Sequence, residues 1–404
     1  MKKIFIASHA MEIGGAERSL LGLLESIDYT EFQVDLMLYR HAGELMDYIP
    51  AQVHLLPENK QLSCLAVPVS DVIKKRQFHI LWGRFLAKQR AKQKDKKNKS
   101  TKESIVGIEY SHKYVKKYIS PINPQIEYDL AISFLTPHYI VAEKIRAKKK
   151  IAWIHTDYSS VYLDEDSEWE MWDSYDNIVS ISEKCTEGFL SIFPNAREKI
   201  IEIENILSDR LIQKKVGEFS ATDEIKRQNN DVILLSIGRF CEAKNFENIP
   251  EICSSLIQKG IRVKWYIIGF GGMEDAIRAN IKLFKMENVV HILGKKENPY
   301  PYIAACDIYV QPSRYEGKCV TVREAQFLHK PVIITNYSTA TSQVRDGIDG
   351  MIVPIENQGC AKKIAEIIQD TELQQKLISN TYKFDYTNAG EIKKLEALVN
   401  GQGE

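Results

Sequence analysis

Two cations in one short loop could bind a phosphate group. The segment SIGRFCEAKNF places Arg239 and Lys244 after an apolar, strand-like stretch and before a predicted helix that begins near Asn245. Side-chain cations and the free N–H groups of a helix N-terminus both attract phosphate oxygens. Because Arg and Lys are common at strand ends, the loop indicates a phosphate site only together with other residues.

Two glycine-bearing loops would let a ligand approach the backbone closely. The segment IIGFGGMED places Gly269, Gly271 and Gly272 after a strand, and ASHAMEIGGAER places Gly14 and Gly15 before a helix. Neither loop has the spacing G-x-G-x-x-G of a dinucleotide-binding turn, which disfavours a dehydrogenase.

Further candidate groups are a histidine, an acidic run and a pair of glutamates. His155 ends the apolar strand of AWIHTDY, where it could act on a bound substrate. The run DED at 164–166 could hold a metal, but acids are frequent at helix N-termini, and that interpretation is favoured. Glu316 and Glu324 stand eight positions apart, one on a predicted loop and one in the helix that follows. Two solvated glutamates around a helix start are the simpler alternative.

The elements that must position these residues are short apolar strands alternating with amphipathic helices. This alternation is typical of parallel sheets covered on both faces. Two series of such units, separated near residues 202–224, predict two Rossmann-like α/β domains that face each other across a cleft. The expected bounds are 1–206 and 207–384, with a helix near 385–404 packing back on the first domain. Ligands bind such sheets at the carboxyl ends of the strands, so site residues should lie in the loops that follow strands.

The order and spacing of these motifs resemble the retaining family-four glycosyltransferases of the GT-B fold. The segment YEGKCVTVREAQFLHKPVI matches that family's YEGFGLxxxEAMAxGKPVI, which carries its E-x7-E motif. The segments GGAER and IVSISE extend the resemblance into the first half. Lys318 and Cys319 replace a frequent Phe-Gly pair, and STATSQV replaces a Gly-rich GGxxE segment. Both regions would surround the donor sugar, so the resemblance does not imply which sugar is bound.

The resemblance implies a role for each candidate residue. Glu324 would accept hydrogen bonds from the donor's ribose hydroxyls, and Glu316 would lie at the donor sugar. A nucleotide-sugar is long, which suits two carboxylates held well apart. Backbone amides of the turn that follows Glu316 would reach the sugar hydroxyls or the phosphate. The expected donor-binding residues are Arg239, Lys244, Gly269, Gly317, Lys318, Cys319, Val320 and Glu324.

By the same resemblance, the acceptor would bind the first domain near Gly14, Gly15 and His155. The expected catalytic residues are Glu316, His155, Arg239 and Lys244. The two cations would stabilise the departing diphosphate in place of a metal, so neither a metal nor another cofactor is expected.

The resemblance implies a retaining, hexosyltransferase-type enzyme. It would move a sugar from a nucleotide-diphosphate sugar, with a UDP-sugar favoured, to a glycan or a polyprenyl-linked acceptor in bacterial capsular or other surface polysaccharide synthesis. Two alternatives stay open: a GT-B-like sugar-nucleotide epimerase without a separate acceptor, and a nonenzymatic membrane-binding or nucleic-acid-binding protein.

Composition places limits on the compartment. The formal net charge of the 404 residues is zero, and the seven cysteines form no C-x-x-C pair, which fits a reducing compartment better than a disulfide or zinc framework. The N-terminal apolar run is too short for a signal peptide, and no apolar stretch approaches the ~20 residues that span a bilayer. The expected location is the cytoplasm, with a peripheral position on the inner membrane face as a further expectation.

A strongly basic segment covers residues 74–102. It holds twelve Lys or Arg residues and one acid, Asp95, with aromatic and aliphatic residues in its first half. One interpretation is a solvated helix or a disordered insertion. The other is an element that places aromatic side chains at the headgroup boundary of an anionic membrane, with lysines facing the lipid. No nucleic-acid motif accompanies the segment, so nucleic acid is not the expected partner.

Overall fold

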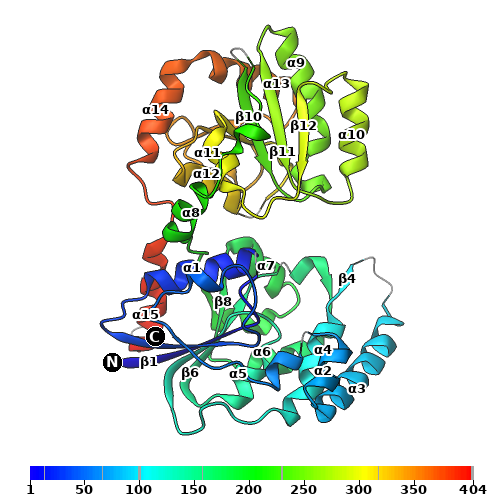
Figure 1. The fold of residues 1–404 in the computed structure, drawn as a ribbon, viewed down its shortest axis with the longest axis vertical. Coiled ribbons are helices and arrows are strands. Elements are labelled where there is room, and N and C mark those ends of the chain that lie inside the picture. Colours follow the sequence, from blue (N-terminus) through cyan, green and yellow to red (C-terminus); the bar gives the residue numbers. More distant parts are fainter. Residues whose placement is uncertain are drawn as a thin grey trace. The chain divides into compact units, whose positions relative to one another are not determined.

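The computed structural model describes residues 1–12, 14–65, 67–98, 102–156, 158–228, 231–316 and 318–401. The chain divides into two compact units: unit 1 is Met1–Ser208 with Asn388–Glu404, and unit 2 is Asp209–Thr387. Each unit has its own parallel sheet with helices packed beside it (Figure 1). The prediction of two parallel α/β domains is confirmed.

Unit 1 is built on a seven-stranded parallel sheet in the order β3-β2-β1-β5-β6-β8-β9. The order reverses between β1 and β5, and the carboxyl ends of these two neighbours form a topological switch point. A separate two-stranded sheet, β4 (Glu103–Ser104) with β7 (Val161–Tyr162), was not expected from the sequence. The strands of the main sheet are β1 (Lys2–Ser8), β2 (Phe32–Leu38), β3 (His54–Leu55), β5 (Tyr128–Ser133), β6 (Ala147–Ile154), β8 (Asn177–Ser180) and β9 (Ile200–Glu202).

The helices of unit 1 bury apolar stripes against this sheet or against one another. In the first helix, Leu20, Leu21, Leu23 and Leu24 are buried, as the pattern SLLGLL predicts. The helices are α1 (Gly15–Ser26), α2 (Val69–Lys74), α3 (Phe78–Asp95), α4 (Val106–Val115), α5 (Tyr139–Lys144), α6 (Glu165–Asp173), α7 (Glu183–Leu190) and α15 (Ile392–Asn400).

Unit 2 is built on a six-stranded parallel sheet in the order β12-β11-β10-β13-β14-β15. Counted from its own first strand the order is 3-2-1-4-5-6, and the switch point lies between β10 and β13. All six residues of β11 are buried, because helices cover both faces of the sheet. The strands are β10 (Val232–Ile237), β11 (Val263–Ile268), β12 (Val290–Gly294), β13 (Ile308–Gln311), β14 (Val332–Thr335) and β15 (Met351–Val353).

One helix of unit 2 begins later than the sequence suggests. The predicted start near Asn245 is wrong, because Asn245 has a φ of 61° and ends a short 3-10 turn. A second turn, Phe246–Asn248, precedes the α-helix that begins at Ile249. The helices are α8 (Asp209–Val216), α9 (Ile249–Gln258), α10 (Glu274–Leu283), α11 (Tyr300–Ala305), α12 (Val320–Phe327), α13 (Asn357–Gln369) and α14 (Thr371–Thr381).

After unit 2 the chain returns to unit 1 through α15. The Lys2 ammonium donates hydrogen bonds to the carbonyl oxygen of Val399 at 3.1 Å and to Oδ1 of Asn400 at 2.7 Å. Lys394 donates to the carbonyl oxygen of Glu202 at 3.0 Å. These bonds join α15 to strands β1 and β9 of the sheet of unit 1.

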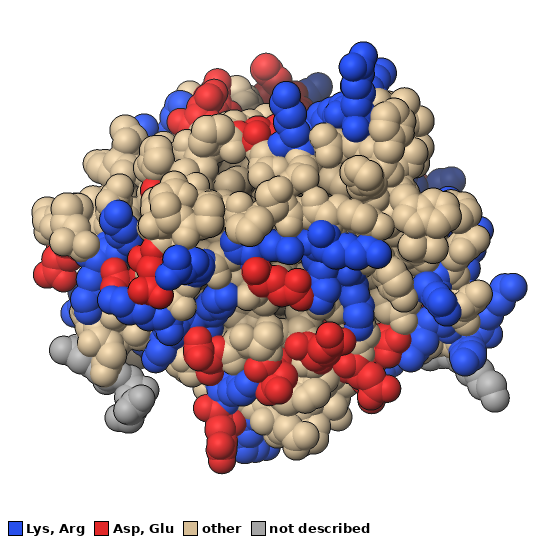
Figure 2. Space-filling model, turned by 90° about the horizontal axis from the view of Figure 1, so that it is seen from below, with Lys and Arg blue, Asp and Glu red and all other residues tan. Residues whose placement is uncertain are grey.

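The surface carries both signs of charge. Figure 2 shows Lys and Arg side chains interspersed with Asp and Glu, in keeping with the formal net charge of zero. Within the ranges that the structure describes, no helix is both long and apolar enough to cross a membrane.

Candidate functional site

The loop after β10 is held against the loop after β11 by two glycines. Gly269 and Gly271 have φ values of 152° and 150°, a region in which side chains are strained. A Cβ atom on Gly269 would lie 1.9 Å from the carbonyl oxygen of Gly238, and one on Gly271 would lie 2.5 Å from that of Phe240. The structure therefore requires these glycines for packing between loops, and a contact of Gly269 with the donor stays a prediction.

The predicted cation and carboxylate meet where β10 and β13 end. The Lys244 ammonium donates to Oε1 of Glu316 at 2.5 Å, and Ser313 Oγ donates to the same oxygen at 2.6 Å. The Sγ atom of Cys319 lies 3.7 Å from Lys244 Nζ. Sequence reasoning missed Ser313, although it ends the predicted strand DIYVQPS.

The ionisation of this cluster follows from its burial. The side chains of Lys244 and Glu316 are only 16% and 11% exposed. Burial alone would lower the pKa of Lys244, but Cys319 and the Glu316 carboxylate raise that pKa overall. Burial raises the pKa of the Cys319 thiol. Lys244 is therefore a fixed cation at neutral pH, with further N–H groups to offer an anion.

The segment STATSQV, which departs from the family pattern, stabilises the loop that carries Glu316. Thr339 Oγ1 donates to the carbonyl oxygen of Glu316 at 2.9 Å, and Gln343 Nε2 donates to that of Cys319 at 2.6 Å. Tyr337 in turn donates to Oε1 of Gln343 at 2.7 Å. STATSQV thus supports the loop by side-chain hydrogen bonds, which a single sequence does not reveal.

Glu324 lies on α12 and is fully buried. The hydroxyl of Tyr300, at the start of α11, donates to its Oε1 atom at 2.8 Å. Tyr300 is 3% exposed and was not among the predicted site residues. Its bond fixes the direction of the Glu324 carboxylate.

The remaining donor residues take different positions. Arg239 is exposed, and its side chain makes no ion pair within the part of the chain that the structure describes. Val320 begins α12, and Lys318 precedes it in a half-buried position. Gly317 lies outside the described residues. Direct side-chain contacts join three of the predicted residues, namely Lys244, Glu316 and Cys319.

Unit 2 also has a polar groove that no predicted residue lines. It encloses about 850 Å³ beside the edge strand β12, and Lys226, Lys264 and His291 are among its lining residues. β12 is separated from β10 by β11, so this groove is at the sheet edge rather than at the switch point. Its position makes it a weaker candidate for a nucleotide.

The three predicted residues of unit 1 come after strands β1 and β6. Gly14 directly precedes α1 and Gly15 is its first residue, where the helix N-terminus offers N–H groups. His155 follows β6, and its ring centroid lies 4.6 Å from that of Phe134. Burial lowers the pKa of His155 to about 3, so its imidazole is neutral at pH 7. Its Nε2 atom is buried and has no hydrogen-bond partner among the described residues.

A cavity of about 270 Å³ opens at the switch point of unit 1. Two histidines that sequence reasoning missed, His9 and His112, face each other there with ring centroids 5.6 Å apart. Within the described ranges, His9 Nε2 and His112 Nδ1 have no hydrogen-bond partner. The lining residues are His9, Ala10, Glu12, Glu17, Tyr39, Arg40, Leu62, Leu65, His112 and Leu135.

The cavity histidines are neutral because they are buried. Burial lowers the pKa of His9 to about 4 and that of His112 well below its ordinary value. A neutral imidazole both donates and accepts one hydrogen bond, which suits a sugar hydroxyl. His112 comes from α4 and His9 from the end of β1, so only the folded chain brings them together.

These shifts predict that unit 1 loses stability in acid. The unfolded chain binds a proton at His9 below about pH 6.5, whereas the folded chain binds it only below about pH 4. Stability from this group is therefore complete above pH 6.5 and falls as the pH is lowered. We expect the free energy of unfolding to fall less steeply in His9→Gln than in the wild type, by roughly 1 kcal/mol per pH unit between pH 6.5 and 4.5. Urea titrations at several pH values measure this.

The exposed His79 supplies a matched control. His79→Gln should keep the pH dependence of the wild type, because its ring lies on the surface against Tyr118. Equal slopes for the wild type and His9→Gln would contradict the assignment of a buried, neutral His9.

The acidic run at 164–166 is a helix start, as favoured from the sequence. Asp164 is the residue before α6; it pairs with Lys94 at 2.8 Å and accepts a hydrogen bond from Tyr110 at 2.5 Å. Burial works to raise its pKa, but the bonds from Lys94 and Tyr110 lower that pKa overall. In the ranges covered by the structure, no group of three or more His, Cys, Asp or Glu side chains could hold a metal ion.

The family of unit 2 follows from its sequence. Residues 219–384 match the family described as Glycosyl transferases group 1. These residues are therefore similar to the group 1 glycosyltransferases. The matched range contains the predicted donor residues Arg239, Lys244, Glu316 and Glu324. The family predicted from the E-x7-E segment is confirmed.

The chain spans about two fifths of the length of the curated glycosyltransferases that it matches. The capsular polysaccharide biosynthesis glycosyltransferase CapM of Staphylococcus aureus is 29% identical over 160 residues, 39% of this chain and 42% of CapM. A second relative, from Campylobacter jejuni, is named as a diphospho-undecaprenol 4-alpha-N-acetylgalactosaminyltransferase. It is 26% identical over 147 residues, 36% of this chain and 40% of its own.

Solved glycosyltransferase structures share the fold over the whole chain. A glycosyltransferase of Rickettsia africae has a TM-score of 0.62 at 16% identity and covers 100% of this chain and 99% of its own. HepE of Anabaena, in complex with UDP and glucose, has a TM-score of 0.63 at 16% identity, with coverage of 99% and 100%. At these identities the likeness concerns the fold, which is GT-B as expected.

Proposed function

We propose that this protein is a retaining glycosyltransferase. It transfers a sugar from a nucleotide-diphosphate sugar, with a UDP-sugar favoured, to a glycan or lipid-linked acceptor in bacterial surface polysaccharide synthesis. The observation that carries this proposal is the Lys244–Glu316 pair at the switch point of unit 2, inside the range matched to the group 1 glycosyltransferases. HepE binds UDP, and the Campylobacter relative is named for a polyprenyl-linked substrate, which supports these donor and acceptor classes.

The donor site places positive charge where negative charge develops during the reaction. The bond between the anomeric carbon and the diphosphate oxygen breaks, and the nucleoside diphosphate leaves with the bonding electrons. Lys244 and the exposed Arg239 stabilise that negative charge, while Glu316 orients the sugar and Glu324, held by Tyr300, binds the ribose. The acceptor oxygen forms the new bond on the same face of the sugar, and its proton passes to the oxygen of the departing diphosphate.

The acceptor binds unit 1 at its switch point. The cavity between His9 and His112 offers imidazole nitrogens that have no hydrogen-bond partner among the described residues, and these can bind hydroxyl groups. Gly14 and Gly15 lie farther along the same loop after β1, at the start of α1, and the neutral His155 follows β6 of the same sheet. A sugar hydroxyl, rather than a charged group, is the chemistry that neutral histidines recognise.

A donor screen tests this function. The purified chain is incubated with UDP-, GDP- and ADP-sugars, with and without polyprenyl-diphosphate-linked sugars, and both nucleoside diphosphate release and acceptor mass are measured. We expect equimolar release and a mass increase of one sugar, with acceptor present. Conversion of a nucleotide-sugar into its epimer without acceptor would instead support an epimerase. No turnover of any donor would contradict the proposal.

We expect transfer to continue in excess EDTA, with activity within about twofold of the untreated enzyme. The reason is that Lys244 and Arg239 already oppose the charge of the leaving diphosphate. The assay compares initial rates with EDTA, with added magnesium and with added manganese. Loss of activity in EDTA that magnesium or manganese restores would show that the two cations are insufficient.

A further inference from the structure

Helix α3 has two apolar faces, of which one is covered. Ile80, Gly83, Ala87 and Ala91 follow one another at intervals of three or four residues and are all buried. A Cβ atom on Gly83 would lie 3.0 Å from the carbonyl oxygen of Tyr114, so α3 and α4 pack closely along this stripe. This face accounts for the position of α3 in unit 1.

The opposite face presents aromatic side chains to solvent. Phe78, Trp82 and Phe85 are 59%, 56% and 50% exposed. At about 100° per residue they fall within one narrow stripe, roughly opposite Gly83 and Ala87. The rings of Trp82 and Phe85 stack with centroids 5.8 Å apart. A stripe of exposed large apolar residues of this kind indicates an interaction surface.

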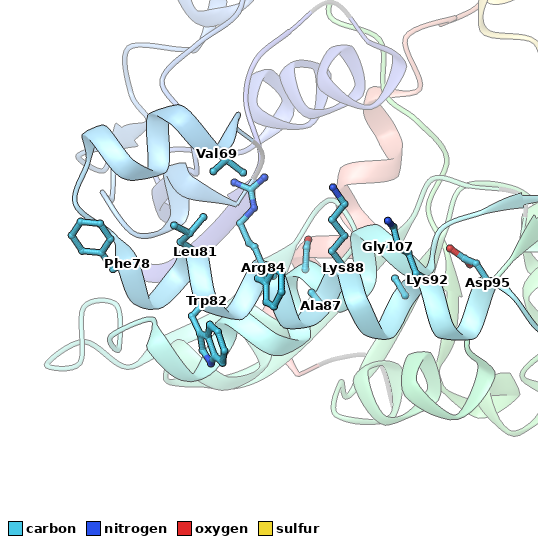
Figure 3. A pocket seen from close by; sticks show the side chains of 13 residues that line it. Val69, Phe78, Leu81, Trp82, Arg84, Ala87, Lys88, Lys92, Asp95 and Gly107 are labelled. Atoms are coloured by element: carbon cyan, nitrogen blue, oxygen red, sulfur yellow. The ribbon is translucent and has the colours of Figure 1, made fainter.

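The stripe borders a groove of about 880 Å³. Val69 from α2 and Leu81 from α3 line one part of it, and Ala87 and Gly107 line another (Figure 3). The groove runs along α3. Lys88 and Lys92 follow Trp82 along the helix and point to the top of the view, whereas the Trp82 ring points to the bottom (Figure 3). Its lining is mainly apolar, so its occupant must be apolar as well.

The second half of α3 and the residue after it carry three cations that have no partner among the described residues. Lys88, Lys92 and Lys96 follow at intervals of four residues and are exposed. Their ammonium groups have no ion pair or hydrogen bond within the part of the chain that the structure describes. By contrast, Lys94 pairs with Asp164, and Arg84 donates to the carbonyl oxygens of Cys64 and Val67. Lys99, also in the basic segment, lies outside the described residues.

We propose that the stripe of Phe78, Trp82, Phe85, Lys88, Lys92 and Lys96, named here the α3 stripe, docks on an anionic lipid bilayer. Aromatic side chains prefer the headgroup boundary, and ammonium groups are attracted to anionic headgroups. The α3 stripe offers both on one side of the helix, within an arc of about 120°, and the adjoining groove takes apolar acyl-chain segments. Exposed aliphatic residues beside it, such as Val69 and Ile73, suit a bilayer better than nucleic acid, in which bases stack on aromatic rings.

Tryptophan emission reports this contact directly. Trp82 is the one exposed tryptophan of the five: Trp153, Trp172 and Trp265 are buried, and Trp169 is half-buried. We expect a blue shift of the emission when the full chain meets vesicles that contain phosphatidylglycerol at low salt, and none with phosphatidylcholine alone. Trp82→Phe should lose the shift yet still sediment with the anionic vesicles.

Two sets of variants separate the aromatic and cationic contributions. Trp82→Ser with Phe85→Ser should abolish sedimentation, whereas Tyr382→Ser, an exposed aromatic in unit 2, should leave it unchanged. Changing Lys88, Lys92 and Lys96 to Gln should weaken binding on the order of a hundredfold, since each cation near an anionic surface contributes about fivefold. The same charge removed at Lys259, Lys282 and Lys285, exposed in unit 2, should have little effect.

The inference does not rest on the proposed transfer reaction, because binding is measured without donor or acceptor. Failure of the chain to bind anionic vesicles at low salt would overturn it, as would equal binding by the wild type and the α3 stripe variants. A dimer in light scattering that Trp82→Ser with Phe85→Ser dissociates would show that a second copy covers the α3 stripe instead. Tighter binding to RNA than to vesicles would likewise overturn it.

Discussion

Lys244→Gln and Arg239→Ala are each expected to lower the rate of sugar transfer by about 10²- to 10³-fold. Both substitutions remove a cation that, in the proposed mechanism, faces the charge of the leaving diphosphate, and loss of one such contact costs roughly 3–4 kcal/mol in the transition state. Gln at 244 can still donate a hydrogen bond to Glu316, which is 11% exposed, so the variant should remain folded. Arg239 is exposed and makes no ion pair with the described residues, so its loss should not affect stability. The measurement is kcat with saturating donor, beside the melting temperature.

A lysine elsewhere in unit 2 supplies the control. Lys363 pairs with Glu366 on α13 at 2.8 Å, but both side chains are about half exposed. Lys363→Gln should leave transfer and melting temperature within error of the wild type, as most surface ion pairs contribute little. Near-normal transfer by a folded variant that lacks both Arg239 and Lys244 would show that the diphosphate binds elsewhere.

Gly269→Ala is expected to destabilise unit 2 by more than about 3 kcal/mol. The new Cβ would lie 1.9 Å from the backbone oxygen of Gly238, and backbone cannot move aside as a flexible side chain can. The φ of 152° adds strain of its own, of order 1–3 kcal/mol. Urea unfolding measures the loss, and failure to fold is its extreme form.

Gly260→Ala introduces backbone strain without a steric clash, so it serves as the control. Gly260 also has a positive φ, 78°, but a Cβ atom there would meet no heavy atom within 4 Å. This variant should lose only about 1–2 kcal/mol. If Gly269→Ala unfolded at the same urea concentration as Gly260→Ala, the close packing between the loops after β10 and β11 would be wrong.

The sequence predicted where the proposed donor residues lie because they follow the ends of strands. Apolar runs such as VILLSIG and DIYVQPS identify β10 and β13, and the residues that follow them must lie at carboxyl ends. The positions of Arg239, Lys244 and Glu316 follow from that rule alone. The start of the following helix could not be predicted in this way. Asn245 adopts a left-handed conformation that ends a short turn, so α9 begins only at Ile249.

Contacts between distant segments could not be predicted from one sequence. Tyr300 reaches Glu324 from another helix, and His9 meets His112 across about a hundred residues of chain. Glycines were predicted to admit a ligand, yet Gly269 also admits the neighbouring loop, since a missing Cβ serves either purpose. In each case tertiary packing, not local pattern, decides the partner.

Hydrogen–deuterium exchange of the full chain with and without UDP tests the central claim most directly, because it locates the nucleotide on the molecule. Bound nucleotide slows exchange of the amides that it contacts or orders. We predict slower exchange in peptides that cover residues 239–249 and 319–327, which carry Lys244 and Glu324, and a smaller effect in Lys244→Gln. Slower exchange confined to peptides over 264–266 and 287–293, beside the groove at β12, would contradict the account.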